Sequence, residues 1–330
     1  MLKVLFSFCL SIFMLANVVP ADAQPFSSST RLITSSTENG QLVTRLRSID
    51  HATGALTTLQ TYQGFGFAVP PAYNRPPRHM VGGSQSATGK IAIQHYDNGN
   101  NFNLVIDSTT GNLVSQPIHL GFVSESIPAG FLSPYNDNYL LSLRRKSTMN
   151  GIPLSRFAEV EVFDRGTGQK IANIPTNISF VDILDHSLSW NGLTGDIFYR
   201  TWNGLQKYNL FSRTETSIRS TNSIYYPAIP KLDALTGNII AIDWNGFTFE
   251  VQEYDVRSQN PRPRVHYTLP VNSTIFGNVA SLKGDEFKFV EAGAYGGANL
   301  MIVDIRNSVL IHSIPLPPSI YVGLTLKFID

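Results

Sequence analysis

A strand-turn-strand pattern that recurs six times is the feature that most restricts how this chain can fold. In each copy, two runs of alternating polar and apolar residues flank a short polar turn. The turn opens with an acidic residue or an asparagine, at Asp50, Asp107, Asp164, Asn209, Asp255 and Asp304. Successive turns are separated by 57, 57, 45, 46 and 49 residues. An internal repeat of roughly 40–50 residues indicates a sheet-forming unit of about four short strands that stacks against its neighbours.

The first three turns share the pattern Asp-x-x-Thr-Gly. An Asp side chain at the first position accepts hydrogen bonds from the amides of its own turn, and the final Gly adopts a positive φ without steric cost. We therefore expect each turn to join the third and fourth strands of its repeat.

The strand before each of these hairpins ends close to an Asn-Gly pair, at 39–40, 98–99, 150–151, 203–204 and 245–246. Asn-Gly favours a two-residue type I′ hairpin because both central residues need positive φ. Trp202 and Trp244 then occupy equivalent strand ends, whereas Trp190 belongs to the turn before a second strand. No segment has the 3.6-residue periodicity of an amphipathic helix.

The two ends of the chain complement each other. Residues 319–328 have the pattern of a first strand but no hairpin follows them, and the N-terminal repeat begins with a second strand. We expect residues 319–328 to supply the inner strand of the first repeat, which removes the free sheet edge of an open array.

These features resemble a six-bladed β-propeller, similar to the class that includes the YVTN-type, TolB-like and gluconolactonase-like propellers. The resemblance is carried by the Asp-x-x-Thr-Gly turns at Asp50, Asp107 and Asp164. It implies an all-β fold of four-stranded antiparallel blades in one domain over residues 24–330, closed by the C-terminal strand.

Residues 1–23 have the pattern of a signal peptide: a lysine, an apolar run and a small-x-small ending at Ala21 and Ala23. The only cysteine, Cys9, lies in this segment, so we expect a mature chain without disulfides. The sequence thus predicts a secreted protein, extracellular or periplasmic.

The charge pattern limits the partners that the chain can bind. Lys and Arg number 25 against 24 Asp and Glu, and neither sign forms a block. A nucleic-acid-binding surface needs an excess of positive charge, so we exclude nucleic acid as the main partner. No apolar run after the leader is long enough to span a membrane. We expect a monomer that binds an extracellular or periplasmic protein or a small molecule.

Candidate ligand-binding residues fall in two places. The long Pro-rich segment 64–80 carries Arg78 and His79, and segments of this kind act either as recognition surfaces or as plugs over the core. The second group lies at the starts of the predicted inner strands, around the mouth of a central channel. Its members are Glu125, Asp182, Asp185, His186, Tyr225, Tyr226, Asn278 and Tyr321.

Two functions remain open from these residues. Glu125, Asp182 and Asn278 offer the oxygen ligands that Ca²⁺ prefers, which makes a channel-centred metal-dependent lactonase, or another hydrolase or lyase, the alternative. The chain has no Gly-x-Ser-x-Gly elbow, and His266 falls in a strand, where histidines usually pack. The preferred hypothesis is therefore a binding scaffold that needs no cofactor.

Overall fold

The structure is a computed structural model. It describes residues 26–39, 41–63, 84–85, 89–97, 100–122, 129–133, 135, 137–145, 157–179, 183–201, 204–220, 230–258, 262–292, 297–318 and 325–329.

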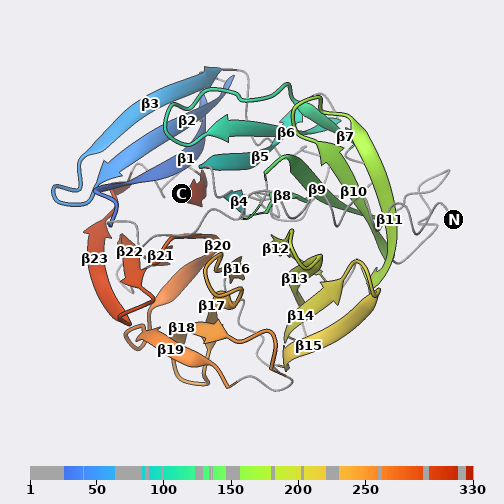
Figure 1. Ribbon diagram of the computed structural model, residues 1–330. Coiled ribbons are helices and arrows are strands. Elements are labelled where there is room, and N and C mark those ends of the chain that lie inside the picture. Colours follow the sequence, from blue (N-terminus) through green and yellow to red (C-terminus); the bar gives the residue numbers. More distant parts are fainter. Residues whose placement is uncertain are drawn as a thin grey trace, which may run out of the picture.

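The described residues form six antiparallel sheets of four strands each, set around a common centre (Figure 1). From the inner to the outer edge, the first three sheets contain β24 (Thr325–Ile329), β1 (Ser29–Glu38), β2 (Gln41–Asp50) and β3 (Leu56–Gln63); β4 (Ser84–Gln85), β5 (Lys90–Asp97), β6 (Asn100–Asp107) and β7 (Ile118–Phe122); and β8 (Ala129–Leu132), β9 (Tyr139–Arg145), β10 (Phe157–Asp164) and β11 (Lys170–Ser179). The other three contain β12 (Ile183–Asn191), β13 (Asp196–Thr201), β14 (Gly204–Asn209) and β15 (Thr214–Ser220); β16 (Lys231–Leu232), β17 (Ile239–Trp244), β18 (Phe249–Tyr254) and β19 (Arg264–Thr268); and β20 (Thr274–Lys283), β21 (Glu286–Ala292), β22 (Ala298–Asp304) and β23 (Val309–Pro315).

The strand order gives every sheet two different ends. Strands run up and down in sequence order, so the turns between first and second strands and between third and fourth strands share one end, which we call the turn end. The hairpins between second and third strands share the opposite end with the connections between sheets, and we call it the connection end. This all-β arrangement is a β-propeller fold, as the repeat predicts.

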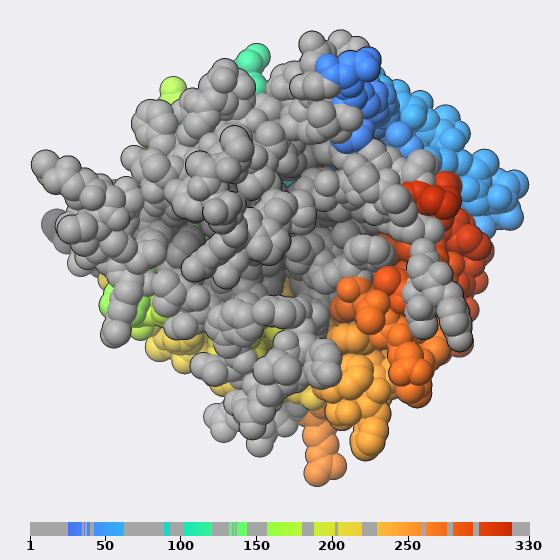
Figure 2. Space-filling view, turned by 180° about the vertical axis from the view of Figure 1, so that it is seen from behind, coloured from blue at the N-terminus to red at the C-terminus, as the bar shows by residue number. Residues whose placement is uncertain are grey.

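The two ends of the chain meet in one sheet. β24 pairs antiparallel with β1 along its inner edge, the pairing expected from the two incomplete end repeats. The backbone amide and hydroxyl of Ser27 donate to the Glu286 carboxylate, which joins the residues before β1 to the sheet of β20–β23. Figures 1 and 2 both place the blue N-terminal sheet beside the red C-terminal one.

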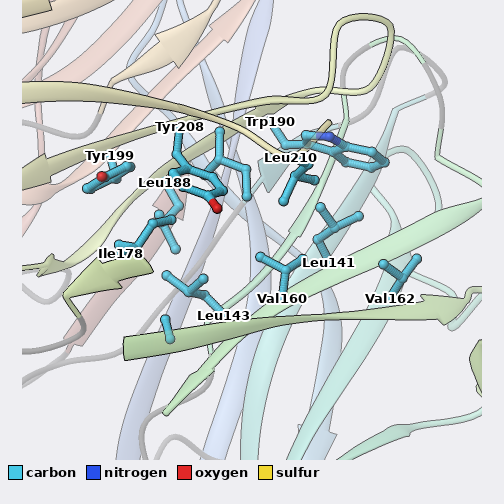
Figure 3. Close-up of a cluster of buried hydrophobic side chains, with 12 residues drawn as sticks. Leu141, Leu143, Val160, Val162, Ile178, Leu188, Trp190, Tyr199, Tyr208 and Leu210 are labelled. Carbon is cyan, nitrogen blue, oxygen red and sulfur yellow. The ribbon is translucent and has the colours of Figure 1, made fainter. Parts of the chain in front are cut away.

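Apolar side chains fill the spaces between neighbouring sheets. Six clusters of buried residues lie in the described part of the chain, and each joins one sheet to the next, including the last sheet to the first. In the cluster of Figure 3, Leu141 and Val160 of one sheet face Trp190 and Tyr208 of the next. Middle strands packed this way are buried on both faces: in the last sheet nearly every residue of β21 and β22 is buried, whereas the outer strand β23 is largely exposed.

The three Asp-x-x-Thr-Gly turns have the predicted Asp hydrogen bonds and the predicted positive φ at Gly. Asp50 accepts hydrogen bonds at Oδ1 from the amide of Thr53 at 2.8 Å and from its hydroxyl at 2.7 Å, and Asp107 and Asp164 bind their own turns in the same way. The closing glycines Gly54, Gly111 and Gly168 have φ of 70°, 74° and 69°.

The Asn-Gly prediction is confirmed in part. Glu38 pairs with Gln41 and Asp97 with Asn100, so two residues separate the strands in each case, as expected. At 245–246 the prediction is wrong, because Trp244 pairs with Phe249 and leaves a four-residue loop, in which the Asn245 side chain accepts from two following amides. At 203–204 it is also wrong, because Gly204 already belongs to β14 and pairs with Thr201. Residues 150–151 lie outside the described ranges.

Candidate functional site

Most of the sequence-predicted site residues lie outside the described ranges: Arg78, His79, Glu125, Asp182, Tyr225, Tyr226 and Tyr321. Asp185 and His186 lie in β12 and Asn278 lies in β20, and only their backbone is described. β12 and β20 are inner strands, so the sequence placed these three residues on the correct strands. Their role in a ligand or metal site stays a prediction.

A buried charged network lies at the connection end, between the sheets of β12–β15 and β16–β19. Arg200, Arg219 and Asp243 are each the residue before the last of their strands, β13, β15 and β17. Those strands run in the same direction, so the three side chains converge at one end of the sheet interface. Below them, the apolar cluster of Phe198, Ile239 and their neighbours fills the same interface.

Asp243 is the centre of this network. Its carboxylate lies 3.8 Å from Arg200 Nη1 and 3.2 Å from Arg219 Nε, and it accepts a hydrogen bond from the Tyr254 hydroxyl at 2.9 Å. Arg219 Nη1 donates to Gln252 Oε1 at 2.6 Å and to Tyr254 Oη at 2.7 Å. The contacts span both sheets, so the network fixes their relative position as well as the direction of each guanidinium.

The ionisation of the network follows from its burial. Burial lowers the pKa of Arg200, and the neighbouring Asp243 carboxylate offsets part of that effect. Burial and the same carboxylate raise the pKa of Tyr254, which therefore remains a hydrogen-bond donor. The Arg219 side chain is 26% exposed, against 6% for Arg200, so Arg219 is the member of this group that reaches solvent. It is suited to donate to a carbonyl or carboxylate of a ligand.

Two exposed apolar side chains lie at the same end of the β16–β19 sheet. Phe247, in the loop between β17 and β18, is 83% exposed, and Val271, in the connection to β20, is 71% exposed. The two segments are bound together, because Thr248 Oγ1 donates to the Leu269 carbonyl at 2.7 Å. Single exposed apolar residues are common, and here two of them lie on segments joined by this hydrogen bond.

Neither the charged network nor the apolar pair was predicted from the sequence. A charged residue near the end of an otherwise apolar second strand, in "DIFYRT" and "IIAIDW", was the available signal. Phe247 was hidden by the Asn-Gly interpretation, which placed it in a strand rather than in a loop.

Two absences concern only the described residues. No three His, Cys, Asp or Glu residues in the described ranges come close enough to hold a metal ion. Within the same ranges, no helix has the length and apolar character needed to cross a bilayer.

Comparison with known proteins gives the fold and no family. No family model and no curated protein matches the chain. The solved structure of TolB from Acinetobacter baumannii is similar over 96% of this chain and 70% of TolB, with a TM-score of 0.56 and 14% identity. An acylaminoacyl peptidase bound to Z-Gly-Gly-Phe-chloromethyl ketone aligns with a TM-score of 0.49 and 10% identity, over 93% of this chain and 53% of the peptidase. At these identities the likeness to TolB indicates a β-propeller and does not transfer a function.

Proposed function

We propose that this chain is an exported, closed six-bladed β-propeller that acts as a binding scaffold for a protein ligand at its connection end. Export is supported by the leader pattern of residues 1–23, and six blades by the six four-stranded sheets. The observation that carries the binding function is the exposure of Phe247 and Val271 on adjoining segments. A protein ligand that covers both side chains removes their apolar surface from water. This burial stabilises the complex by about 25 cal/mol for each Å² of apolar surface.

Arg219, at the connection end of β15 in the neighbouring sheet, offers a second, polar contact. Its guanidinium is held by Asp243, Gln252 and Tyr254, so little conformational freedom is lost when a ligand binds it. Interfaces typically combine an apolar centre with arginine contacts, and the connection ends of these two neighbouring sheets together present both.

Site-specific photo-crosslinking tests the proposal. A benzoylphenylalanine residue replaces Phe247 in the protein exported by its native host, and crosslinked partners are identified by mass spectrometry. We expect a discrete adduct whose yield falls about tenfold or more when Val271→Ser is added, because lost interface anchors cost more than about 1.4 kcal/mol.

Leu235 provides the matched control. It is 55% exposed, similarly apolar, and lies in the turn between β16 and β17, at the turn end of the same sheet. The photo-reactive residue at position 235 should give no such adduct. Equal adducts at 235 and 247, or none at 247, would contradict binding at the connection end.

A further inference from the structure

A serine, a histidine and a glutamate form a chain of hydrogen bonds between the sheets of β16–β19 and β20–β23. His266 Nδ1 lies 3.0 Å from Ser308 Oγ, and His266 Nε2 lies 3.0 Å from Glu253 Oε2. The His266 side chain has no exposed surface and that of Glu253 is 10% exposed, whereas Ser308 lies half-buried in the turn between β22 and β23. We infer that Ser308 is a nucleophile, activated by His266 and Glu253, that accepts the acyl group of carboxylic esters.

The hydrogen bonds fix the histidine in the tautomer that a base needs. An ionised carboxylate only accepts hydrogen bonds, so Glu253 selects the ring with a proton on Nε2. The lone pair of Nδ1 then faces the Ser308 hydroxyl. Asn238 Nδ2 donates to the second oxygen of Glu253 at 2.6 Å and fixes the direction of the carboxylate. Nucleophile, base and orienting acid are thus each held within hydrogen-bond distance of the next.

The backbone presents the serine from a strained position. Ser308 has φ of 57°, at the turn position that is glycine in the first three sheets and Arg213, with φ of 59°, in the β12–β15 sheet. A non-glycine residue in this region costs of order 1–3 kcal/mol, and such residues cluster at functional sites. The Arg264 side chain is exposed, and its Nη2 donates to the Arg306 carbonyl at 3.4 Å, two residues before Ser308. Arg264 is the donor we assign to the oxyanion.

The reaction follows from these positions. Ser308 Oγ bonds to the ester carbonyl carbon as its proton moves to His266 Nδ1, and the ester C–O bond breaks with that proton transferred to the leaving alcohol. Water, deprotonated by the same nitrogen, then attacks the acyl-serine and restores the Ser308 hydroxyl. The net change is hydrolysis of an ester to an acid and an alcohol.

The base also has the appropriate ionisation. Burial lowers the pKa of His266 below its ordinary value of 6.5, and the charges of Arg264 and Arg306 act in the same direction, while Glu253 raises it. These are the charged groups that act on the ring from both sheets. His266 is therefore neutral, and able to accept a proton, at pH 7.

Labelling with an alkyl fluorophosphonate tests the inference. The serine oxygen displaces fluoride from phosphorus, and peptide mass spectrometry locates the adduct. We expect an adduct on Ser308 whose rate rises with pH to a plateau reached by about pH 7, since the plateau begins above the lowered pKa of His266. His266→Gln should lower the rate about 100-fold or more. Glu253→Gln should also lower it, because the amide donates to Nε2 and moves the ring proton to Nδ1.

Two controls separate reactivity from folding. Ser308→Gly removes the hydroxyl and relieves the positive φ, so it should fold normally and lose the adduct and any hydrolysis of p-nitrophenyl acetate. Ser212 lies in the corresponding turn of the β12–β15 sheet, where its hydroxyl contacts Asn209 and Thr214, and should remain unlabelled. No adduct on Ser308 in the folded protein, or an equal rate in His266→Gln, would overturn the inference.

Discussion

Replacing Asp243 by Ala should be among the most destabilising single changes at the connection end. The substitution removes a carboxylate that is 5% exposed and contacts two arginines and the Tyr254 hydroxyl. Removing one partner of a buried ion pair costs about 3–5 kcal/mol, because the other charge stays buried. Arg219 is 26% exposed and regains water, so we expect the lower end, about 3 kcal/mol.

Urea unfolding followed by tryptophan fluorescence and far-UV circular dichroism measures this loss. Tyr254→Phe removes the hydrogen bond to Asp243 and the one from Arg219 but leaves the charges paired, so it should cost less, about 2 kcal/mol. Adding Arg200→Met to Asp243→Leu should recover most of the stability, since an apolar pair replaces the ion pair. A loss below about 1 kcal/mol for Asp243→Ala, at an unchanged m-value, would refute the reasoning.

Two further predictions concern single turns. The hydrogen bond and charge of Lys90 and the turn amides lower the pKa of Asp107 from 3.8 to about 2, so its stabilisation is complete above pH 4 and is lost as the pH falls towards 2. Asp107→Asn should therefore lower stability at pH 7, and the difference from the unaltered protein in thermal unfolding should shrink to a small remainder at pH 2. Gly111→Ala should destabilise by more than Gly284→Ala: both have positive φ, but the new methyl lies 2.9 Å from Leu46 in the first case and meets nothing within 4 Å in the second. Equal losses in urea would show that backbone conformation, and not the Leu46 contact, sets the cost at Gly111.

The sequence predicted turns and strand order well because these depend on neighbouring residues. An Asp at the start of a turn and a Gly at its end encode a local hydrogen bond and a local φ, so Asp50 and Gly54 could be read directly. The Trp-Asn-Gly at 244–246 shows the limit. Its loop length depends on the pairing of Trp244 with Phe249, and a local pattern does not determine which of two possible partners a strand residue takes.

The repeat by itself determined that the chain is all-β, that its sheets have four strands, and that its two ends meet in one sheet. Each of these follows from periodicity along the chain. Only the tertiary structure decided which side chains meet between sheets. His266 and Ser308 are 42 residues apart in different repeats, as are Asp243 and Arg200 at a similar separation. Contacts of this kind depend on how two twisted sheets pack. The sequence of one strand alone does not specify which residue of the neighbouring sheet it contacts.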